Sequence, residues 1–169
     1  MYKKEANWRV IYTKSRQEKK VANLLTEKGI QNYLPTIKTL KQWSDRKKKV
    51  TEPLFKSYIF IYADESERNS ALTRESVIKT IYFNGKPAII PEIEMESIKK
   101  MLESPEKISV FNGIVKGVIV KIESGPFEGI EGIVNSVSDN ENTLSVSIQL
   151  LNRTISVSIP SNTKVKRIN

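Results

Sequence analysis

The chain has 169 residues, of which 38% are hydrophobic and 28% are charged, and it contains neither cysteine nor histidine. Such a composition is typical of globular domains and predicts one large or two small ones. The missing residue types exclude disulfides, thiolate metal sites, His-dependent nucleophiles and the usual zinc ligands, so we expect neither an enzyme nor a cofactor. No apolar run reaches the roughly 20 residues of a membrane helix and no secretion signal is visible, so we expect a cytoplasmic protein with no membrane partner.

The positive charge is concentrated at one end of the chain. Residues 1–60 hold 15 Lys and Arg against 5 Asp and Glu, whereas residues 61–169 hold 13 against 14. This asymmetry indicates a polyanionic partner for the first third, with nucleic acid the leading candidate. A basic surface that serves only solubility is an equally good interpretation of charge alone.

The first hundred residues alternate between strand and helix patterns. Residues 8–13 are aromatic and β-branched and predict a strand, and Ser15 with Glu18 is a capping-box pattern that predicts a helix after it. Further strands are predicted at 33–38, 50–55, 57–62 and 77–83, with weak helical character at 64–76 and a helix after Pro91. Residues 41–49 are polar and strongly basic, which is typical of a hairpin tip.

After about residue 113 the pattern changes to five short β-rich runs separated by turn residues, which predicts a small barrel. We therefore expect an α+β protein with a first domain at 1–103, a linker at 104–112 and a second domain at 113–169. The expected strands are 118–122, 132–137, 143–150, 154–159 and 165–168.

Residues 117–134 of the second domain resemble the KOW motif. Val118, Val120 and Ile122 are expected to alternate toward a core, after which come tight turns and a close approach of the next strand. The motif positions are Gly117, Gly125, Pro126, Phe127, Gly129 and Gly132. A generic small barrel with glycine turns is the alternative.

The first domain resembles the NGN domain of the NusG family of transcription elongation factors. The resemblance rests on Trp8, Tyr12, Lys14, Arg16, Glu18, Val21-Ala22, Leu25, Tyr33-Leu34-Pro35, Glu52-Pro53-Leu54-Phe55, Tyr58-Ile59-Phe60, Phe83, Gly85 and Pro87 through Pro91. Together with the KOW motif it covers nearly the whole chain in the family's domain order. It implies an NGN-type α/β sandwich followed by an SH3-like barrel, in a protein that we expect to be monomeric.

Two departures from the family pattern point to a specialised paralogue. Arg9 stands where general members carry an aromatic residue, and Phe55-Lys56-Ser57-Tyr58 stands where they carry Phe-Pro-Gly-Tyr. The chain is more similar to RfaH and the UpxY group, which accompany surface-polysaccharide operons. The resemblance thus implies an operon-directed antiterminator, with a general housekeeping NusG as the alternative.

In the family, the NGN domain bridges the RNA polymerase cleft and suppresses pausing. The resemblance assigns contact with the β′ clamp helices to Tyr12, Phe55, Tyr58 and Phe60, and contact with the β gate loop to Asn69 and Ser70. Because side chains alternate along a strand, about half of such aromatic residues must instead face the core.

Nucleic-acid contacts are expected from two basic segments. Lys14, Arg16, Lys19 and Lys20 match the region that meets the non-template strand in specialised paralogues. Arg46, Lys47, Lys48 and Lys49 are expected to follow upstream DNA phosphates, and Trp43 beside them is a candidate for stacking on an unpaired base. A solvated hairpin tip explains this second cluster equally well.

The KOW domain of the family recruits ribosomal protein S10 or Rho, and in one relative it refolds into helices held by a Glu–Arg ion pair. Glu52 matches that Glu, but Thr143 stands at the Arg position, and residues 145–148 and 155–159 are rich in β-branched residues. We therefore expect a permanently folded barrel, which persistent helical circular dichroism of the KOW domain would refute.

Two alternatives lie outside the family. A ribosome-associated RNA-binding protein with a KOW module would carry a more basic second domain than the 6 Lys and Arg against 5 Asp and Glu in residues 113–169. A carboxylate enzyme would need convergent acids, yet Glu92, Glu94 and Glu96 are two residues apart, a spacing that scatters side chains around a helix.

Overall fold

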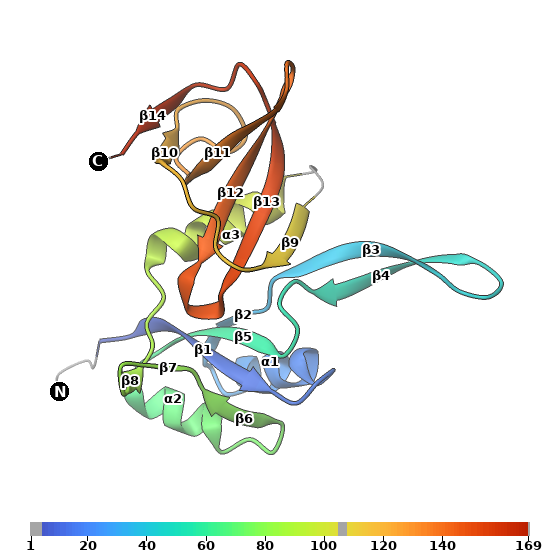
Figure 1. Ribbon diagram of the computed structural model, residues 1–169. Coiled ribbons are helices and arrows are strands. Elements are labelled where there is room, and N and C mark those ends of the chain that lie inside the picture. The colour runs from blue at the N-terminus through green and yellow to red at the C-terminus, as the bar shows by residue number, and fades with distance from the viewer. Residues whose placement is uncertain (1–4, 105–107, 169) are drawn as a thin grey trace. The chain divides into compact units, whose positions relative to one another are not determined.

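The computed structural model describes residues 5–104 and 108–168, and the chain divides into two compact units, residues 1–90 and 91–169. We describe each unit by itself. The predicted α+β class is confirmed, because the first unit combines helices with a sheet and the second is rich in strands (Figure 1).

The first unit is built on a four-stranded sheet with the order β2-β5-β1-β6 and on two further strand pairs. Its elements are β1 (Asn7–Thr13), α1 (Glu18–Glu27), β2 (Gln31–Tyr33), β3 (Thr36–Gln42), β4 (Lys47–Pro53), β5 (Tyr58–Ala63), α2 (Glu65–Leu72), β6 (Val77–Thr80), β7 (Tyr82–Phe83) and β8 (Lys86–Pro87). The strands predicted at 8–13 and 57–62 are the two central strands, β1 and β5.

One face of this sheet is covered by α1 and α2. Side chains of β1 and β5 that point to this face, such as Ile11 and Ile59, form one buried cluster with Val21 and Leu25 of α1 and Ala71 of α2 (Figure 1). Burial of this apolar face stabilises the unit, at roughly 25 cal/mol for each Å² removed from water. The side chains that alternate with this set, from Trp8 to Tyr12 and from Tyr58 to Tyr62, lie on the opposite face of β1 and β5.

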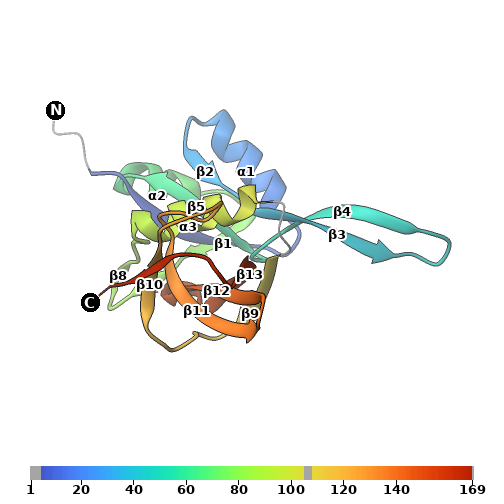
Figure 2. The ribbon, with the colours of Figure 1, turned by 90° about the horizontal axis from the view of Figure 1, so that it is seen from above.

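Strands β3 and β4 form a separate two-stranded ribbon, which we call the arm. Seven residue pairs, from Thr36–Pro53 to Gln42–Lys47, hold it together, and it extends away from the four-stranded sheet in both views (Figures 1 and 2). The segment expected to be a loose tip at 41–49 is therefore largely strand, and the connection is reduced to residues 43–46.

The second unit consists of α3 (Glu92–Glu103) and a six-stranded antiparallel sheet with the order β14-β10-β11-β12-β13-β9. The strands are β9 (Ile108–Asn112), β10 (Ile119–Ile122), β11 (Glu131–Ser138), β12 (Glu141–Ile148), β13 (Arg153–Pro160) and β14 (Val165–Arg167), with a 3-10 turn, η1 (Gln149–Leu151), before β13. All five strands predicted after residue 117 are present.

The expected domain limits of 1–103 and 113–169 stay a prediction, and two observations bear on them. Helix α3, expected to close the first domain, groups by its contacts with the second unit. Residues 108–112, expected to be linker, form β9 and pair with β13 from Ile108–Val157 to Asn112–Arg153. Residues 108–112 thereby extend the sheet beyond β13 as an edge strand.

Candidate functional site

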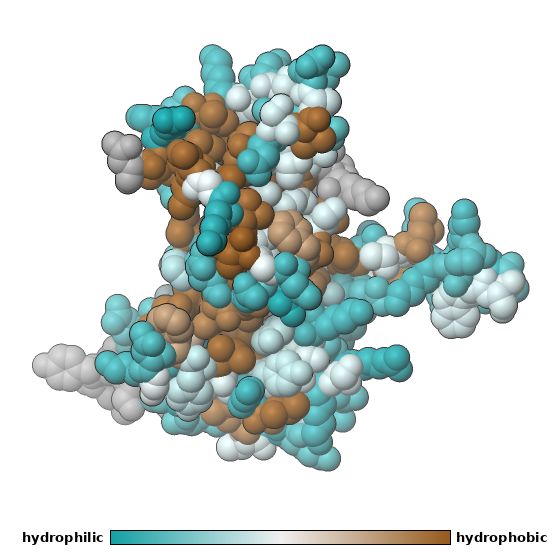
Figure 3. All heavy atoms as spheres, in the orientation of Figure 1, coloured by the Kyte–Doolittle hydropathy of each residue, from teal (hydrophilic) through white to brown (hydrophobic). Residues whose placement is uncertain are grey.

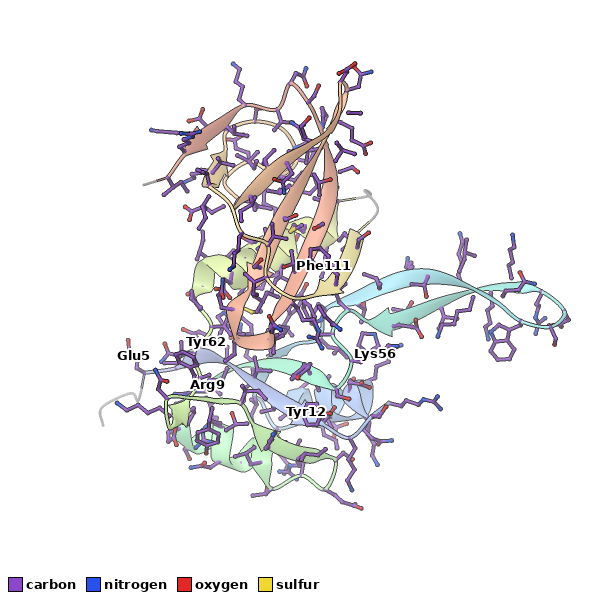
Figure 4. All side chains as sticks on the ribbon, in the orientation of Figure 1. Glu5, Arg9, Tyr12, Lys56, Tyr62 and Phe111 are labelled. Carbon is purple, nitrogen blue, oxygen red and sulfur yellow. The ribbon has the colours of Figure 1, made fainter. Side chains whose placement is uncertain are left out.

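The side of the first sheet opposite α1 and α2 carries a set of aromatic residues, which we call the aromatic face. Because side chains alternate, the register places three cross-strand pairs on it: Trp8–Tyr62, Val10–Phe60 and Tyr12–Tyr58. The rings of Trp8 and Tyr62 lie 5.4 Å apart and those of Tyr12 and Tyr58 lie 5.2 Å apart. Figure 4 labels Tyr12 and Tyr62 near the two ends of this face.

Exposure divides the aromatic candidates into two groups. Tyr12 and Tyr58 are partly exposed, whereas Phe55 and Phe60 are buried and pack edge to face with their ring centres 5.9 Å apart. Phe55 and Phe60 are thus buried in this structure, although the register places Phe60 on the same face as Tyr58 and Tyr62, and a contact of either residue with a partner stays a prediction. Tyr62 is also partly exposed on this face, and its two-residue spacing from Phe60 is the signal that sequence reasoning overlooked.

The turn that leads into β5 holds a non-glycine residue in a left-handed conformation. Ser57 has a φ of 67°, and Tyr58 N–H donates to Phe55 O across the turn. The buried carboxylate of Glu18 accepts from Ser57 N–H at 2.7 Å, and Thr13 N–H donates to Ser57 O at 2.8 Å. This turn explains the family's glycine, because glycine adopts positive φ without steric cost.

Glu18 therefore has a different role from the one predicted. The cap residue of α1 is Gln17, and no side-chain cap bond is present, so the Ser15–Glu18 capping box is not formed. The Glu18 carboxylate is turned to the Ser57 turn instead. A capping box does occur at α2, where Asp64 and Glu67 each bond the backbone N–H of the other.

Arg9 joins β1 to two other elements. Its guanidinium donates to Ala63 O at 3.5 Å and Pro87 O at 3.4 Å, and lies 3.9 Å from the Glu65 carboxylate (Figure 4). Glu65 also pairs closely with buried Arg68. The substitution of an aromatic residue by Arg9 is thus accommodated by carbonyl groups and one carboxylate at the edge of the helix-covered face.

The gate-loop candidates lie on α2. Asn69 and Ser70 are both exposed, and Asn69 Oδ1 accepts from Arg68 Nη2 at 2.8 Å. The Glu65 carboxylate raises the pKa of the Arg68 guanidinium by hydrogen bonding, so the guanidinium that binds Asn69 stays charged. The structure thereby fixes the orientation of Asn69, while its contact with a partner stays a prediction.

The basic residues before and within α1 are all exposed: Lys14, Arg16, Lys19 and Lys20. Arg16 has a φ of 63°, a conformation that is costly for a residue with a Cβ atom. Lys19 Nζ donates to Thr51 O of β4 at 2.9 Å, so Lys19 links the start of α1 to the base of the arm.

The arm is covered by hydrophilic side chains (Figure 3). Arg46, Lys47, Lys48 and Lys49 are all exposed, as is Trp43. Glu52, which matches an interdomain ion-pair residue of one relative, is engaged within the arm: Lys41 binds its carboxylate, and Thr39 Oγ1 donates to it at 3.3 Å. The hydrogen bond from Lys41 lowers the pKa of the Glu52 carboxyl.

The glycines of the KOW motif in the second unit allow backbone turns and a close approach of two strands. Gly125 and Gly129 have φ of 85° and 89°, and Phe127 between them is 3% exposed, in the core. Val120 and Ile122 are buried as predicted, but Val118, which precedes β10, is 53% exposed and does not face the core. Gly132 lies so close to β12 that an added Cβ would be 2.7 Å from Ser145 O.

A cavity of about 640 Å³ in the second unit lies between α3 and the sheet. Three charged residues line it, Glu94, Lys116 and Glu131, and burial raises the pKa of the Glu94 carboxyl from 4.5 to about 6. No hydrogen bond or ion pair of the Glu94 carboxylate occurs in the described part of the chain.

Replacing Glu94 with Gln is expected to stabilise the second unit at neutral pH. The folded unit binds the Glu94 proton more tightly than the unfolded chain does, so this group lowers the unfolding free energy as pH rises from 4.5 through 6. After discounting for partial exposure, we expect a gain of about 1 kcal/mol at pH 7.5 and almost none at pH 4. Urea unfolding followed through the methyl signals of Ile155 measures it; equal curves for both proteins at pH 7.5 would contradict the burial of this charge.

Neither a metal site nor a membrane helix is found in residues 5–104 and 108–168. No group of three or more acidic side chains there is placed to hold a metal ion. None of the helices in these ranges is both long and apolar enough to cross a bilayer.

An α/β unit with an aromatic sheet face, followed by a β-rich unit with KOW-type turns, is the architecture of the NGN–KOW class of transcription factors. A family model described as "Transcription termination factor nusG" matches residues 6–99, more than half of the chain. The chain therefore belongs to the NusG family, whose members are transcription termination and antitermination factors and not enzymes.

Individual relatives agree with this assignment along nearly the whole chain. The transcription termination/antitermination protein NusG of Rickettsia prowazekii is 23% identical, over 92% of this chain and 87% of its own length. That of Borreliella burgdorferi is 25% identical, over 90% and 94%. A solved structure titled "Domain interaction in Thermotoga maritima NusG" shares the fold with a TM-score of 0.51 at 22% identity, over 97% of this chain and 98% of that chain.

Proposed function

We propose that this protein binds RNA polymerase through the aromatic face of its first unit and suppresses pausing or termination during transcription in the cytoplasm. The observation that carries the proposal is the placement of partly exposed Tyr12, Tyr58 and Tyr62 on the sheet face opposite α1 and α2. Exposed aromatic residues are enriched in protein interfaces, because they bury a large area at a low entropic cost.

The family resemblance supplies the partner surfaces. The tyrosines are proposed to pack on the β′ clamp helices beside Phe60, which the register places on the same face, and Phe55 packs edge to face on Phe60. Asn69 and Ser70, exposed on α2, are proposed to contact the β gate loop. Two contacts on opposite sides of the polymerase cleft would hold the clamp closed, and a closed clamp disfavours the paused state.

The basic residues of the first unit are proposed to contact DNA near the polymerase. Lys14 and Arg16 lie exposed just before α1 and Lys20 lies exposed within it, and Lys19 donates to Thr51 O at the base of the arm. Contacts of this kind with phosphates are independent of sequence and weaken as salt rises. The second unit is proposed to recruit a further partner, either ribosomal protein S10 or Rho.

We also propose a specialised role on particular long operons, of the surface-polysaccharide type, in preference to a housekeeping role. The concentration of positive charge in residues 1–60 and the exposed basic arm support it. Arg9 and Ser57 are accommodated by local bonds, so they mark divergence from general members without contributing to the binding surface themselves.

Pause lifetimes of a reconstituted elongation complex test the polymerase assignment. We expect the purified protein to shorten pauses, and we expect an excess of a general NusG to abolish the effect by competing for the clamp helices. Shortening confined to certain template sequences would support the specialised role. An unchanged pause lifetime, with no binding to the complex, would refute the assignment and favour an RNA-binding function of the KOW unit.

A further inference from the structure

The arm presents two different faces, which the register defines. Lys41 pairs with Lys48 on one face, and Leu40 pairs with Lys49 on the other. Trp43 belongs to the first of these, because the Lys48 ammonium lies 5.6 Å from the centre of its ring. We call this first face, formed by Lys41, Trp43 and Lys48, the stacking face.

Trp43 is held at the end of the arm without packing into any core. Its backbone N–H donates to Arg46 O at 2.8 Å, which closes the hairpin, and its side chain is 53% exposed. Lys48 lies over its ring, and no aromatic ring contacts it in the described part of the chain. A two-stranded ribbon gains little stability from such a side chain, because the indole remains largely in water.

The basic side chains near the Trp43 indole differ in how strongly they are paired with carboxylates. Lys41 is held by the Glu52 carboxylate, so it is partly neutralised. Arg46 lies beside Asp45, with 3.8 Å between Nε and Oδ2, but both side chains are more than 60% exposed, so this pair is weak. Arg46 therefore remains available to an anionic ligand near the indole, whereas Lys47 and Lys49 pair with Gln42 and Leu40 on the opposite face.

We propose that the stacking face binds an unpaired nucleobase on the Trp43 ring while Arg46, in the connection next to this ring, contacts a flanking phosphate. The ligand class is single-stranded nucleic acid, because only unpaired bases offer a ring face, whereas a duplex presents its phosphates and groove edges. Only the origin of the bound nucleic acid depends on the proposed function: an elongation complex would supply it as unpaired DNA or nascent RNA.

The test uses the full chain and labelled oligonucleotides without polymerase. Fluorescence anisotropy measures the affinity for a twelve-nucleotide oligo-dT, an oligo-U of equal length and a twelve-base-pair DNA duplex. Trp43→Ala is expected to weaken binding of the single strands about tenfold and to leave duplex binding within twofold of the original. Trp43→Phe is expected to retain most of the affinity, because the phenyl ring still stacks.

Leu40→Ala is the matched control, because Leu40 is 65% exposed on the opposite face of the same ribbon. It is expected to leave all three affinities unchanged. The dependence of log K on log salt is expected to keep its slope in Trp43→Ala, since no phosphate contact is lost, and to become shallower in Arg46→Gln.

The outcomes separate this proposal from the proposed function. A preference for oligo-dT or for oligo-U would identify the strand, and equal affinity would identify a shared stacking contact. Equal loss of single-strand and duplex binding in Trp43→Ala, or no loss of either, would overturn the stacking proposal even if the protein binds polymerase. Single-strand binding that depends on Trp43 would stand even if pausing is unaffected.

Discussion

Replacing Gly132 with alanine is expected to destabilise the second unit by about 3 kcal/mol, near the upper end for adding a methyl group to a close-packed interior. The added Cβ would lie 2.7 Å from Ser145 O and 2.9 Å from Leu144 Cδ1. The first of these atoms belongs to the backbone of β12, which is fixed by pairing on both sides with β11 and β13. The strand therefore has to shift, and the buried core of the unit shifts with it.

Native-state hydrogen exchange of the β12 and β13 amides measures this effect in the full chain. Gly117→Ala is the matched control: its Cβ would lie 3.0 Å from Ile133 Cγ2, a side-chain atom that can move, so we expect a loss below about 1 kcal/mol. The first unit, followed by the fluorescence of buried Trp8, is expected to unfold as before in both variants. Equal exchange protection in Gly132→Ala and the unmodified chain would show that β11 and β12 are not packed as described.

Replacing Glu18 with alanine is expected to destabilise the first unit by about 2 to 3 kcal/mol, because a hydrogen bond to a charged group is lost and a buried donor is left unsatisfied. Glu18 is 5% exposed, and its Oε1 accepts from Ser57 N–H at 2.7 Å. Urea unfolding followed by tryptophan fluorescence measures the loss. Glu18→Gln keeps a carbonyl oxygen at this place and is expected to cost less than Glu18→Ala.

Ser57→Gly supplies the complementary change at the same turn. Because Ser57 has a φ of 67°, glycine at this position removes steric strain, and we expect a net gain of about 1 kcal/mol. The Glu18 bond goes to the backbone N–H and should persist. A loss of stability in Ser57→Gly, or a Glu18→Ala variant as stable as the parent, would contradict the account of this turn.

The parts of the fold that the sequence predicted are those with strong periodic signals. Trp8, Val10 and Tyr12 alternate with Arg9, Ile11 and Thr13, and this alternation places the aromatic residues on one face of β1. The same rule places Tyr58, Phe60 and Tyr62 together on one face of β5, and it does not predict that Phe60 alone of the three is buried. The glycine turns of the second unit are predicted for the same reason, since positive φ and close strand approach each require glycine.

The features that escaped prediction depend on partners distant in sequence. Lysine is a weak strand former, so Lys47, Lys48 and Lys49 indicate a loop until their pairing with residues 40–42 is known. Glu18 fits a capping box locally, but its bond with Ser57 spans 39 residues. Strand β9 has little pattern of its own and is recognised only by its pairing with β13.

The central claim is that the aromatic face docks on RNA polymerase, and the affinity of the full chain for an elongation complex tests it most directly. The double variant Tyr12→Ala, Tyr58→Ala removes the ring pair at 5.2 Å, which is partly exposed and not part of the buried helix-facing cluster. Loss of hot-spot residues of this kind predicts binding weaker by at least about thirtyfold at any salt concentration. The arm variant Arg46→Gln, Lys47→Gln is expected to lose only a few-fold, and mainly at low salt. Wild-type affinity in the tyrosine variant, with its fold verified by Trp8 fluorescence, would contradict the claim.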